Sequence, residues 1–369
     1  MGKRIPLIVI TGGPCGGKTT AMEEIPKRLR DMGYRVIISR EVATDFFTGG
    51  IPDIARIAKE DPEMYLKIQE QILLEIIFKL RTRRNLANIL GGEKTVLLLD
   101  RGPMDASAYM PQEQFFAALK KNSLNVYDAR DSFDGVVHLV SAADGAEEFY
   151  TLANNEARRE TPIKARFVDK EVQWAWVGVP HFKIIDNSTD FDGKLERLFR
   201  AILGILGEPK PLEIERKFLL ARKPDFKSYP LWRAEKLFIE QMYVAHPDLG
   251  ELRIRKRSTV KFGRGRSQGD STSYYKTRKV DISPAIRRED EEYITWNDYE
   301  HLKAFKDFNR QVIRKHRYCF VYKNQYFELD VLISPERAKG LCLLEIELVN
   351  EKDPVDLPSF LAIEREVTD

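Results

Sequence analysis

The feature that most constrains the fold is a glycine-rich stretch near the start of the chain, residues 12–19, which reads GGPCGGKT. It matches the pattern GxxxxGK[ST] at every fixed position. An apolar, β-branched run precedes it over residues 5–11, and a helical pattern follows over residues 19–32. Glycines in such a loop let successive backbone N–H groups face a phosphate, and the following helix adds its positive end. The sequence therefore predicts a strand, a phosphate-binding P-loop and a helix in succession.

The P-loop defines the first predicted binding site, which is for a nucleoside triphosphate with Mg²⁺. We expect Lys18 to contact the β- and γ-phosphates and the Thr19 hydroxyl to bind the metal ion. The residues predicted to bind the phosphates are Gly12, Gly13, Gly16, Gly17, Lys18, Thr19 and Thr20. The sequence contains no NKxD motif. Either GTP or ATP is therefore compatible with the motifs.

The region around Asp100 adds predicted metal-binding and catalytic residues. Asp100 ends an apolar run and is able to hold Mg²⁺ through water, although any buried strand can end in Asp. Asp100-Arg101 resembles the Asp-Arg pair of nucleoside and nucleotide kinases, whose arginine contacts phosphate. Glu41 follows the second predicted strand, where several of these kinases keep a carboxylate base. A solvated charge at the end of a strand is the alternative interpretation of Glu41.

Two later segments carry further residues that we predict to contact the nucleotide. Arg158 and Arg159 follow a helical stretch, as arginines of a lid over the γ-phosphate do, and as an exposed basic helix end also does. Asn187 follows the last predicted strand of the first domain. Residues that contact the base are common at this place in P-loop kinases.

The hydrophobic periodicity divides the chain into two domains, predicted as residues 1–208 and 209–369. Before the linker at residues 207–211, five short apolar runs alternate with helical stretches, which predicts a three-layer α/β domain with a parallel sheet. After the linker, the period changes from 3.6 to 2 over eight strand-like segments. The second domain is therefore predicted to be an antiparallel β-barrel or a strongly curved sheet.

Charged residues two positions apart recur along these predicted strands, and residues two apart share a face of a strand. The sets are Glu213, Glu215 and Lys217; Arg253, Arg255 and Arg257; Lys276 and Arg278; Glu289 and Glu291; Lys315 and Arg317; Glu328 and Asp330; Glu345 and Glu347. Such regularity predicts a polar interior in which Lys and Arg hold a polyanion and carboxylates bind a divalent metal. The predicted metal ligands here are Glu213, Glu215, Glu345 and Glu347. A sheet with cross-strand salt bridges is the alternative.

The first of these sets, ExExK at residues 213–217, resembles the hallmark of the CYTH, or triphosphate tunnel, family, and the resemblance extends over residues 210–369. It implies that Glu213 and Glu215 take part in metal-dependent triphosphate hydrolysis, if the tunnel is catalytic. Members of this family usually continue into a last helix. We therefore expect the sequence to be truncated at its C-terminus, which would affect part of the tunnel wall or its cap.

The two halves together resemble eukaryotic proteins that join a NadR-kinase-like P-loop domain to a CYTH domain, the TRPL translocation defect protein family. The stretches that carry the resemblance are GGPCGGKTT, SREVATDFF, LLLDRGPMD, DNST, LEIERKFLL, YYKTRK and FELDV, with the pair Arg158 and Arg159. The resemblance implies GTP binding, phosphoinositide binding and a role in membrane-protein trafficking. It also implies a peripheral contact with membranes.

Composition limits the partners and the compartment. No apolar run approaches the roughly 20 residues that span a bilayer, and Cys15, Cys319 and Cys342 have neither disulfide-framework nor metal-ligand spacing. We therefore expect a cytoplasmic protein. The net charge is +3, and the basic clusters are interleaved with acidic ones, which makes nucleic acid an unfavourable partner.

Two functional interpretations follow from the sequence. The first is a regulatory protein that binds GTP or ATP with Mg²⁺, hydrolyses it slowly, and holds a phosphoinositide or another polyphosphate through the second domain or through Arg264 and Arg266. The second is an enzyme, either a small-molecule kinase with Glu41 as its base or a tunnel triphosphatase. We favour the first.

Overall fold

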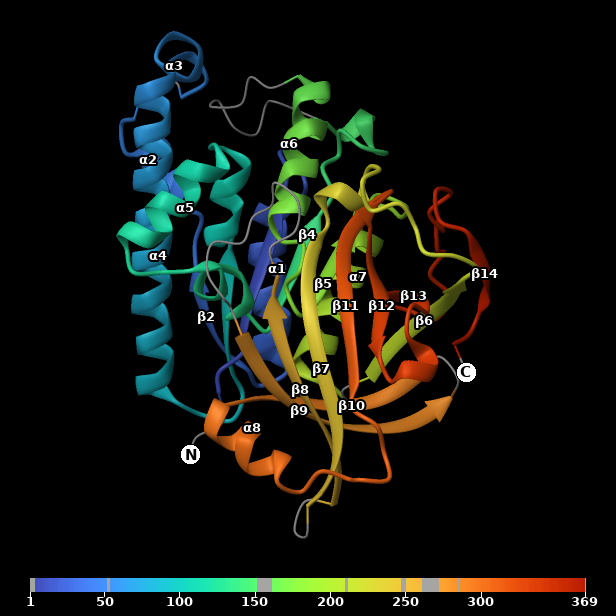
Figure 1. The fold of residues 1–369 in the computed structure, drawn as a ribbon. Coiled ribbons are helices and arrows are strands. Elements are labelled where there is room, and N and C mark those ends of the chain that lie inside the picture. Colours follow the sequence, from blue (N-terminus) through green and yellow to red (C-terminus); the bar gives the residue numbers. More distant parts are fainter. Residues whose placement is uncertain are drawn as a thin grey trace. The chain divides into compact units, whose positions relative to one another are not determined.

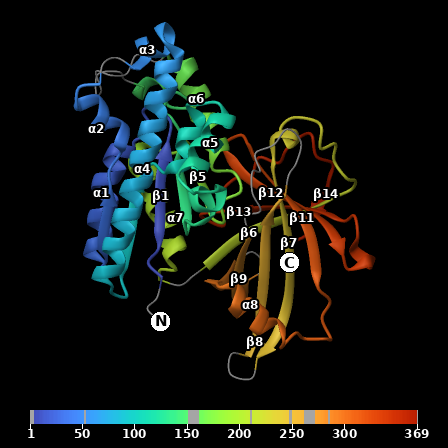
Figure 2. The ribbon, with the colours of Figure 1, turned by 60° about the vertical axis from the view of Figure 1, so that its left-hand side comes forward.

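The computed structural model describes residues 4–51, 54–150, 161–209, 212–246, 250–260, 272–283 and 286–368. The chain divides into two compact units, Met1–Ile202 and Leu203–Asp369. Figure 1 shows the elements of both units in sequence colours, and Figure 2 shows them from a second direction.

The first unit is built on a parallel sheet whose strand order is β2-β3-β1-β4-β5. Its strands are β1 (Leu7–Gly12), β2 (Arg35–Ser39), β3 (Thr95–Asp100), β4 (Gly135–Leu139) and β5 (Phe182–Ile185). Every residue of the central strand β1 is buried. The prediction of an α/β domain with a parallel sheet is confirmed. Because the strands are parallel, the ends of β1, β3 and β4 meet at one edge of the sheet, where the P-loop begins.

Helices connect these strands. They are α1 (Lys18–Asp31), α2 (Val42–Thr48), α3 (Ile54–Glu60), α4 (Pro62–Leu90), α5 (Gln112–Lys121), α6 (Pro162–Ala175) and α7 (Phe191–Leu206). Short turns of 3₁₀ or π type lie at Pro103–Ala108, Tyr127–Asp131 and Glu147–Phe149. Polar caps set two of the helix starts: Asp61 accepts from the Met64 amide at 2.9 Å, and Thr161 from the Lys164 amide at 3.3 Å.

The second unit is an antiparallel sheet with one further helix, α8 (Trp296–Lys303). Its strands are β6 (Leu212–Leu220), β7 (Glu235–His246), β8 (Gly250–Thr259), β9 (Thr272–Ser283), β10 (Ile286–Ile294), β11 (Ile313–Tyr322), β12 (Gln325–Ser334), β13 (Cys342–Glu347) and β14 (Ile363–Glu366). Short 3₁₀ turns lie at Leu231–Arg233 and Glu336–Ala338. The strand order is β10-β9-β8-β7-β11-β12-β13-β6-β14.

The eight strands from β6 to β13 form a closed hydrogen-bonded ring. Ile286–Arg288 of β10 pair with Leu212–Ile214 of β6, so the two ends of the run are joined. Strand β14 pairs with the other end of β6, at Phe218–Leu220. The antiparallel barrel predicted from the alternating pattern is therefore confirmed.

The two faces of this ring differ in character. One face of β7 and β8 is apolar and packs against α8 through Met242, Val244, Leu252, Ile254 and Tyr299. Alternation then places the neighbouring residues of the same strands, which include the arginines of β8, on the opposite face.

Candidate functional site

The P-loop lies between β1 and α1, as the sequence predicts. Gly12 has φ 154°, and a Cβ there would lie 2.2 Å from the Leu139 carbonyl oxygen, so only glycine fits. The Lys18 side chain is buried and its Nζ donates to the carbonyl oxygens of Gly12 at 3.0 Å and Gly13 at 2.9 Å. Thr19 is exposed at the start of α1. A positive charge, a hydroxyl and a helix N-terminus therefore converge at one place.

The remaining predicted phosphate ligands belong to the same loop. Gly17 has φ 88° and directly precedes α1, and a Cβ at Gly16 would lie 2.7 Å from the Leu139 carbonyl oxygen. Thr20 is exposed in the first turn of α1. These features are those of a loop that keeps its backbone accessible to an anion.

Asp100 lies beside this loop at the end of β3, where its backbone is in register with Ile10 of β1. Its Oδ1 is buried and has no hydrogen-bond partner among the described residues. Burial and the neighbouring Glu41 carboxylate raise the pKa of Asp100 to about 6. A buried carboxylate oxygen without a partner fits a divalent cation, which would satisfy the oxygen and favour the ionised form.

Glu41 and Arg101 form an ion pair, with Arg101 Nε 2.6 Å from Glu41 Oε1. Burial alone would raise the pKa of Glu41, but the charges of Arg101 and Lys18 lower it to about 2. A general base is most effective when its pKa lies near the working pH. The arrangement therefore favours a role for Glu41 in holding Arg101. It disfavours the predicted role of Glu41 as a base.

Asp105, which the sequence analysis did not single out, holds the other side of Arg101. Its carboxylate lies 3.3 Å from the Arg101 Nη1 and also accepts hydrogen bonds from Thr11, from the Gly102 amide at 2.8 Å and from Trp176 Nε1 at 3.1 Å. Arg101 has φ 66°, an uncommon value for a residue with a side chain. In the sequence, the one feature that indicates Asp105 is its position four residues after Arg101.

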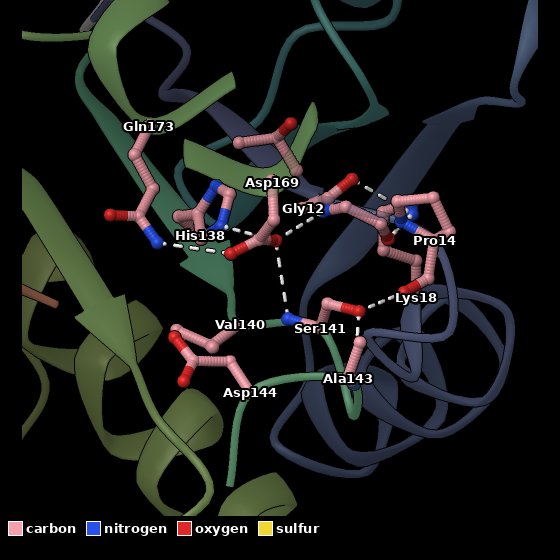
Figure 3. Close-up of polar contacts among 12 residues, drawn as sticks. Gly12, Pro14, Lys18, His138, Val140, Ser141, Ala143, Asp144, Asp169 and Gln173 are labelled. Atoms are coloured by element: carbon pink, nitrogen blue, oxygen red, sulfur yellow. Dashed lines mark hydrogen bonds and ion pairs between the residues drawn. The ribbon is translucent and has the colours of Figure 1, made fainter. Parts of the chain in front are cut away.

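Asp169 on α6 is a second buried carboxylate that the sequence analysis missed, and it contacts the P-loop (Figure 3). Its Oδ1 accepts from the Gly13 amide at 2.7 Å and the Ser141 amide at 3.1 Å, and it lies 3.0 Å from His138 Nε2. Its Oδ2 accepts from Gln173 Nε2 at 3.1 Å. The available signals were a histidine inside the apolar run of β4 and the Asp-Gln pair four apart on α6.

Asn187, predicted to contact a base, takes part in hydrogen bonds between two loops of the first unit. Its Nδ2 donates to the carbonyl oxygens of Ser141 and Asp144, both at 2.8 Å, and its Oδ1 accepts from Lys194 Nζ at 2.7 Å. These bonds use both donors of the amide, so Asn187 ties the end of β5 to the loop after β4. Arg158 and Arg159 lie outside the described residues.

In the second unit, strand register places most of the predicted charged residues on one face. Directly opposed residues of antiparallel neighbours share a face, and Glu345 is opposed to both Lys217 and Glu328. Likewise Arg317 is opposed to Asp330, and Glu347 to Glu215. The face also includes Glu213, Lys315, Arg253, Arg255, Arg257 and Glu291.

Lys276 and Arg278 are exceptions, because the structure places them on the opposite face of β9. Thr277, between them, is opposed to Arg253, whereas Lys276 is opposed to Ile254 of the apolar cluster beneath α8. Lys276 Nζ pairs at 2.8 Å with Glu292, whose side chain is 66% exposed. Spacing in the sequence groups charged residues two positions apart but does not contain the strand register. The register places Lys276 and Arg278 on the face opposite to the shared face.

The carboxylates of the shared face are paired with basic side chains. The buried Arg317 lies 2.7 Å from Asp330 and 2.5 Å from Glu345 and also contacts Glu328, while Asp330 contacts Lys315 as well. Lys217 Nζ lies 2.7 Å from Glu215. Across the described ranges, no group of three or more His, Cys, Asp or Glu side chains is arranged to hold a metal ion. Four of the acidic residues, Glu215, Glu328, Asp330 and Glu345, thus enter ion pairs in this arrangement.

The basic residues of β8 form a separate part of the same face. Arg255 Nη2 lies 2.6 Å from Glu291, and Arg253 lies 3.9 Å from the same carboxylate. Thr277 also donates to Glu291 at 2.9 Å. Arg257 lies on the same face and is buried. Two arginines therefore share the Glu291 carboxylate, and a third arginine lies further along the same face.

Comparisons with known proteins match the two halves of the chain to different families. A family model described as "AAA domain" matches residues 7–194, and one described as "CYTH domain" matches residues 211–365. Two solved structures are similar to the chain at 25% identity, each over 42% of it. They are the hypothetical protein NE1496, with 90% of that chain covered and a TM-score of 0.27, and the inorganic triphosphatase NE1496, with 87% covered and a TM-score of 0.26. A search of curated proteins found no match.

These matches confirm the combination of a P-loop-like domain with a CYTH domain. The finer resemblance to the TRPL translocation defect protein family stays a prediction. In the part of the chain that the structure describes, no helix combines the length and the apolar character needed to cross a membrane.

Proposed function

Since the chain belongs to the AAA domain family, we propose that its first unit binds a purine nucleoside triphosphate, GTP or ATP, together with Mg²⁺. Lys18 and the P-loop amides hold the phosphates, and Thr19 and Asp100 hold the metal ion. Arg101, which pairs with Glu41 and Asp105, contacts a phosphate in this proposal. The metal, when bound, neutralises phosphate charge.

The observation that carries this proposal is the buried Oδ1 of Asp100, which lacks a hydrogen-bond partner among the described residues. A buried polar atom without a partner destabilises the free protein by about 1–3 kcal/mol. A protein keeps such an unfavourable free energy where a ligand later supplies the missing partner of the buried atom. At the end of β3, next to the strand that enters the P-loop, Asp100 would hold the metal ion, which would neutralise charge on the phosphates.

The test is nucleotide binding with and without Mg²⁺, measured by calorimetry. In the unchanged protein, Mg²⁺ should raise the affinity. Lys18→Ala should weaken binding under both conditions, whereas Asp100→Asn should remove most of the gain due to Mg²⁺ and leave metal-free binding nearly unchanged. Equal affinities for the unchanged protein and Lys18→Ala would contradict the proposal.

For the second unit, the three arginines of β8 favour binding of a polyphosphate anion at the shared face. Arginine forms strong charge-assisted hydrogen bonds with phosphate oxygens. The alternative is metal-dependent hydrolysis of a triphosphate by Glu213, Glu215, Glu345 and Glu347. The ion pairs of Lys217 and Arg317 with these and neighbouring carboxylates favour binding over hydrolysis.

Inorganic tripolyphosphate distinguishes these two roles. Arg255→Met should weaken its binding, while Lys276→Met, on the opposite face, should leave binding unchanged. Loss of any phosphate release in the Glu215→Gln variant, with binding retained, would establish the hydrolytic alternative instead.

A phosphoinositide headgroup is a second polyphosphate of the same chemistry, and the resemblance noted from the sequence adds a peripheral membrane contact and a trafficking role to the proposal. Arg264 and Arg266 lie outside the described residues. Sedimentation with vesicles that contain defined phosphoinositides tests the membrane contact. A bound fraction equal to that with vesicles lacking phosphoinositides would count against it.

A further inference from the structure

Asp169 is the residue whose position the proposed site does not yet explain. It is 1% exposed, so it cannot contact a nucleotide, but it accepts hydrogen bonds from Gly13 of the P-loop and from Ser141 of the loop after β4. His138 and Gln173 hold the same carboxylate from β4 and from α6 itself. Burial alone would raise the pKa of Asp169, but its hydrogen-bond partners, His138 first, lower it. Asp169 is thus a buried anion directly behind the phosphate-binding loop (Figure 3).

The Gly13 amide that Asp169 holds belongs to the peptide group between Gly12 and Gly13. This peptide is trans, because the cis bonds among the described residues are all X-Pro, and a trans peptide is planar with its N–H and C=O pointing in opposite directions. Fixing the N–H toward Asp169 therefore directs the Gly12 carbonyl away from Asp169. That carbonyl accepts from Lys18 Nζ at 3.0 Å.

The close approach of Asp169 also accounts for the glycine at position 13. A Cβ added there would lie 2.4 Å from the Asp169 Oδ1. A methyl group at position 13 would therefore displace the carboxylate. The loop after β4 strengthens the same attachment, because the Ser141 hydroxyl donates to the Pro14 carbonyl at 2.5 Å.

From this geometry we infer that Asp169 is a positioning residue for triphosphate binding: by holding the Gly13 amide, it orients the Gly12 carbonyl that holds Lys18. The inference rests on the proposed function of the first unit. Asp169 acts on the nucleotide through the P-loop and Lys18 rather than by contact.

The first test compares two substitutions at position 169 by the affinity for ATP or GTP, measured by calorimetry. Asp169→Ala removes the acceptor and should weaken triphosphate binding by about 10- to 100-fold, the range for loss of hydrogen bonds to a charged group. Asp169→Asn keeps one oxygen that can accept from Gly13 and should recover most of the affinity. Equal, wild-type affinity in both variants would overturn the inference.

The second test separates positioning from simple stabilisation of α6. If Asp169 acts through Lys18, then Asp169→Ala should weaken binding much less in a Lys18→Ala background than in the unchanged protein. Val172→Ala, at a buried apolar position of α6, is the matched control: it should lower the melting temperature without changing affinity. Equal effects of Asp169→Ala in both backgrounds would overturn the inference.

Failure of the proposed function and failure of this inference give different results. Nucleotide affinity that does not depend on Lys18 contradicts the nucleotide site itself. Affinity that depends on Lys18 but not on Asp169 contradicts only this inference. Should Asp169→Ala fail to fold, unchanged triphosphate affinity of Gly13→Ala would overturn the inference, since this substitution displaces the same carboxylate from the other side and is expected to weaken binding by about 10- to 100-fold.

Discussion

At the scale of single residues, the first site holds two carboxylates whose pKa values are moved in opposite directions. Glu41 is paired with Arg101 and has a pKa of about 2, whereas Asp100, buried and close to Glu41, has a pKa of about 6. Arg101 pairs with Glu41, whereas the buried oxygen without a hydrogen-bond partner among the described residues is Oδ1 of Asp100. Such a separation distinguishes two similar groups.

The raised pKa of Asp100 predicts a pH-dependent change in stability. Between the unfolded value of 3.8 and about 6, the folded protein binds the proton more tightly, so the free energy of unfolding decreases as pH rises through this window. Asp100→Asn removes this loss. We expect the variant to be more stable than the unchanged protein at pH 8, by on the order of 1–3 kcal/mol, and the difference to vanish near pH 3.5.

Denaturant unfolding of both proteins over that pH range, without metal or nucleotide, measures the difference. A difference independent of pH would contradict burial of an ionisable Asp100. With Mg²⁺ and nucleotide present, the order of stability should reverse, because only the unchanged protein gains the full binding energy.

The residues that the sequence revealed are those with a fixed local pattern. Lys18, Thr19 and Asp100 stand where motif and strand end predict them. Asp169 could not be assigned, because its partner Gly13 is far away in the sequence and only the packing of α6 brings them together. The hydrogen bonds of Asn187 could not be predicted either, since they involve the backbone of a loop that the sequence does not locate, and its contact with a base stays a prediction.

At the scale of elements, strand register decides which charges of the second unit act together. Alternation along one strand separates two faces but does not say which face is inside. The registers of β8 with β9 and of β9 with β10 assign Thr277 and Glu291 to the face of Arg253, and Lys276 to the other. A motif of charges two apart therefore predicted the shared face for β6, β8, β11, β12 and β13 but not for β9.

The ion pairs across β11, β12 and β13 predict a large loss of stability when Arg317 is replaced. Removing this buried cation leaves Asp330, Glu328 and Glu345 without their shared partner, which costs about 3–5 kcal/mol for a broken buried pair. Arg317→Met should therefore lower the melting temperature strongly at pH 7.

The loss of stability should be smaller at pH 4.5. Burial raises the pKa of Glu328, so at low pH this carboxyl is more readily protonated and no longer leaves a buried charge without its partner. Lys276→Met provides the control, since its partner Glu292 is largely exposed and the pair is expected to contribute less than about 1 kcal/mol. Similar melting temperatures for the two variants would show that the buried network does not stabilise the sheet.

At the scale of the whole molecule, the two compact units each have their own sheet and their own candidate ligand. A ligand that binds only a folded unit stabilises that unit by mass action, by about 2.7 kcal/mol at a hundredfold excess over its Kd. We therefore expect two unfolding transitions in scanning calorimetry. Mg²⁺ with nucleotide should raise one of them and inorganic tripolyphosphate the other.

Lys18→Ala should remove the shift caused by nucleotide and keep the shift caused by tripolyphosphate. A single transition that both ligands raise equally would contradict separate binding by the two units.

The closure of the ring at Leu212–Ile214 and Ile286–Arg288 has a consequence for how the protein is made. Strand β6 is synthesised first in its unit, yet its partners β10, β13 and β14 all come later, so its pairings are distant in sequence. Such long-range pairings slow folding, whereas domains synthesised earlier can fold as they emerge. On the ribosome, the nucleotide-binding unit can thus be complete while β6 still awaits the strands that enclose its charged face.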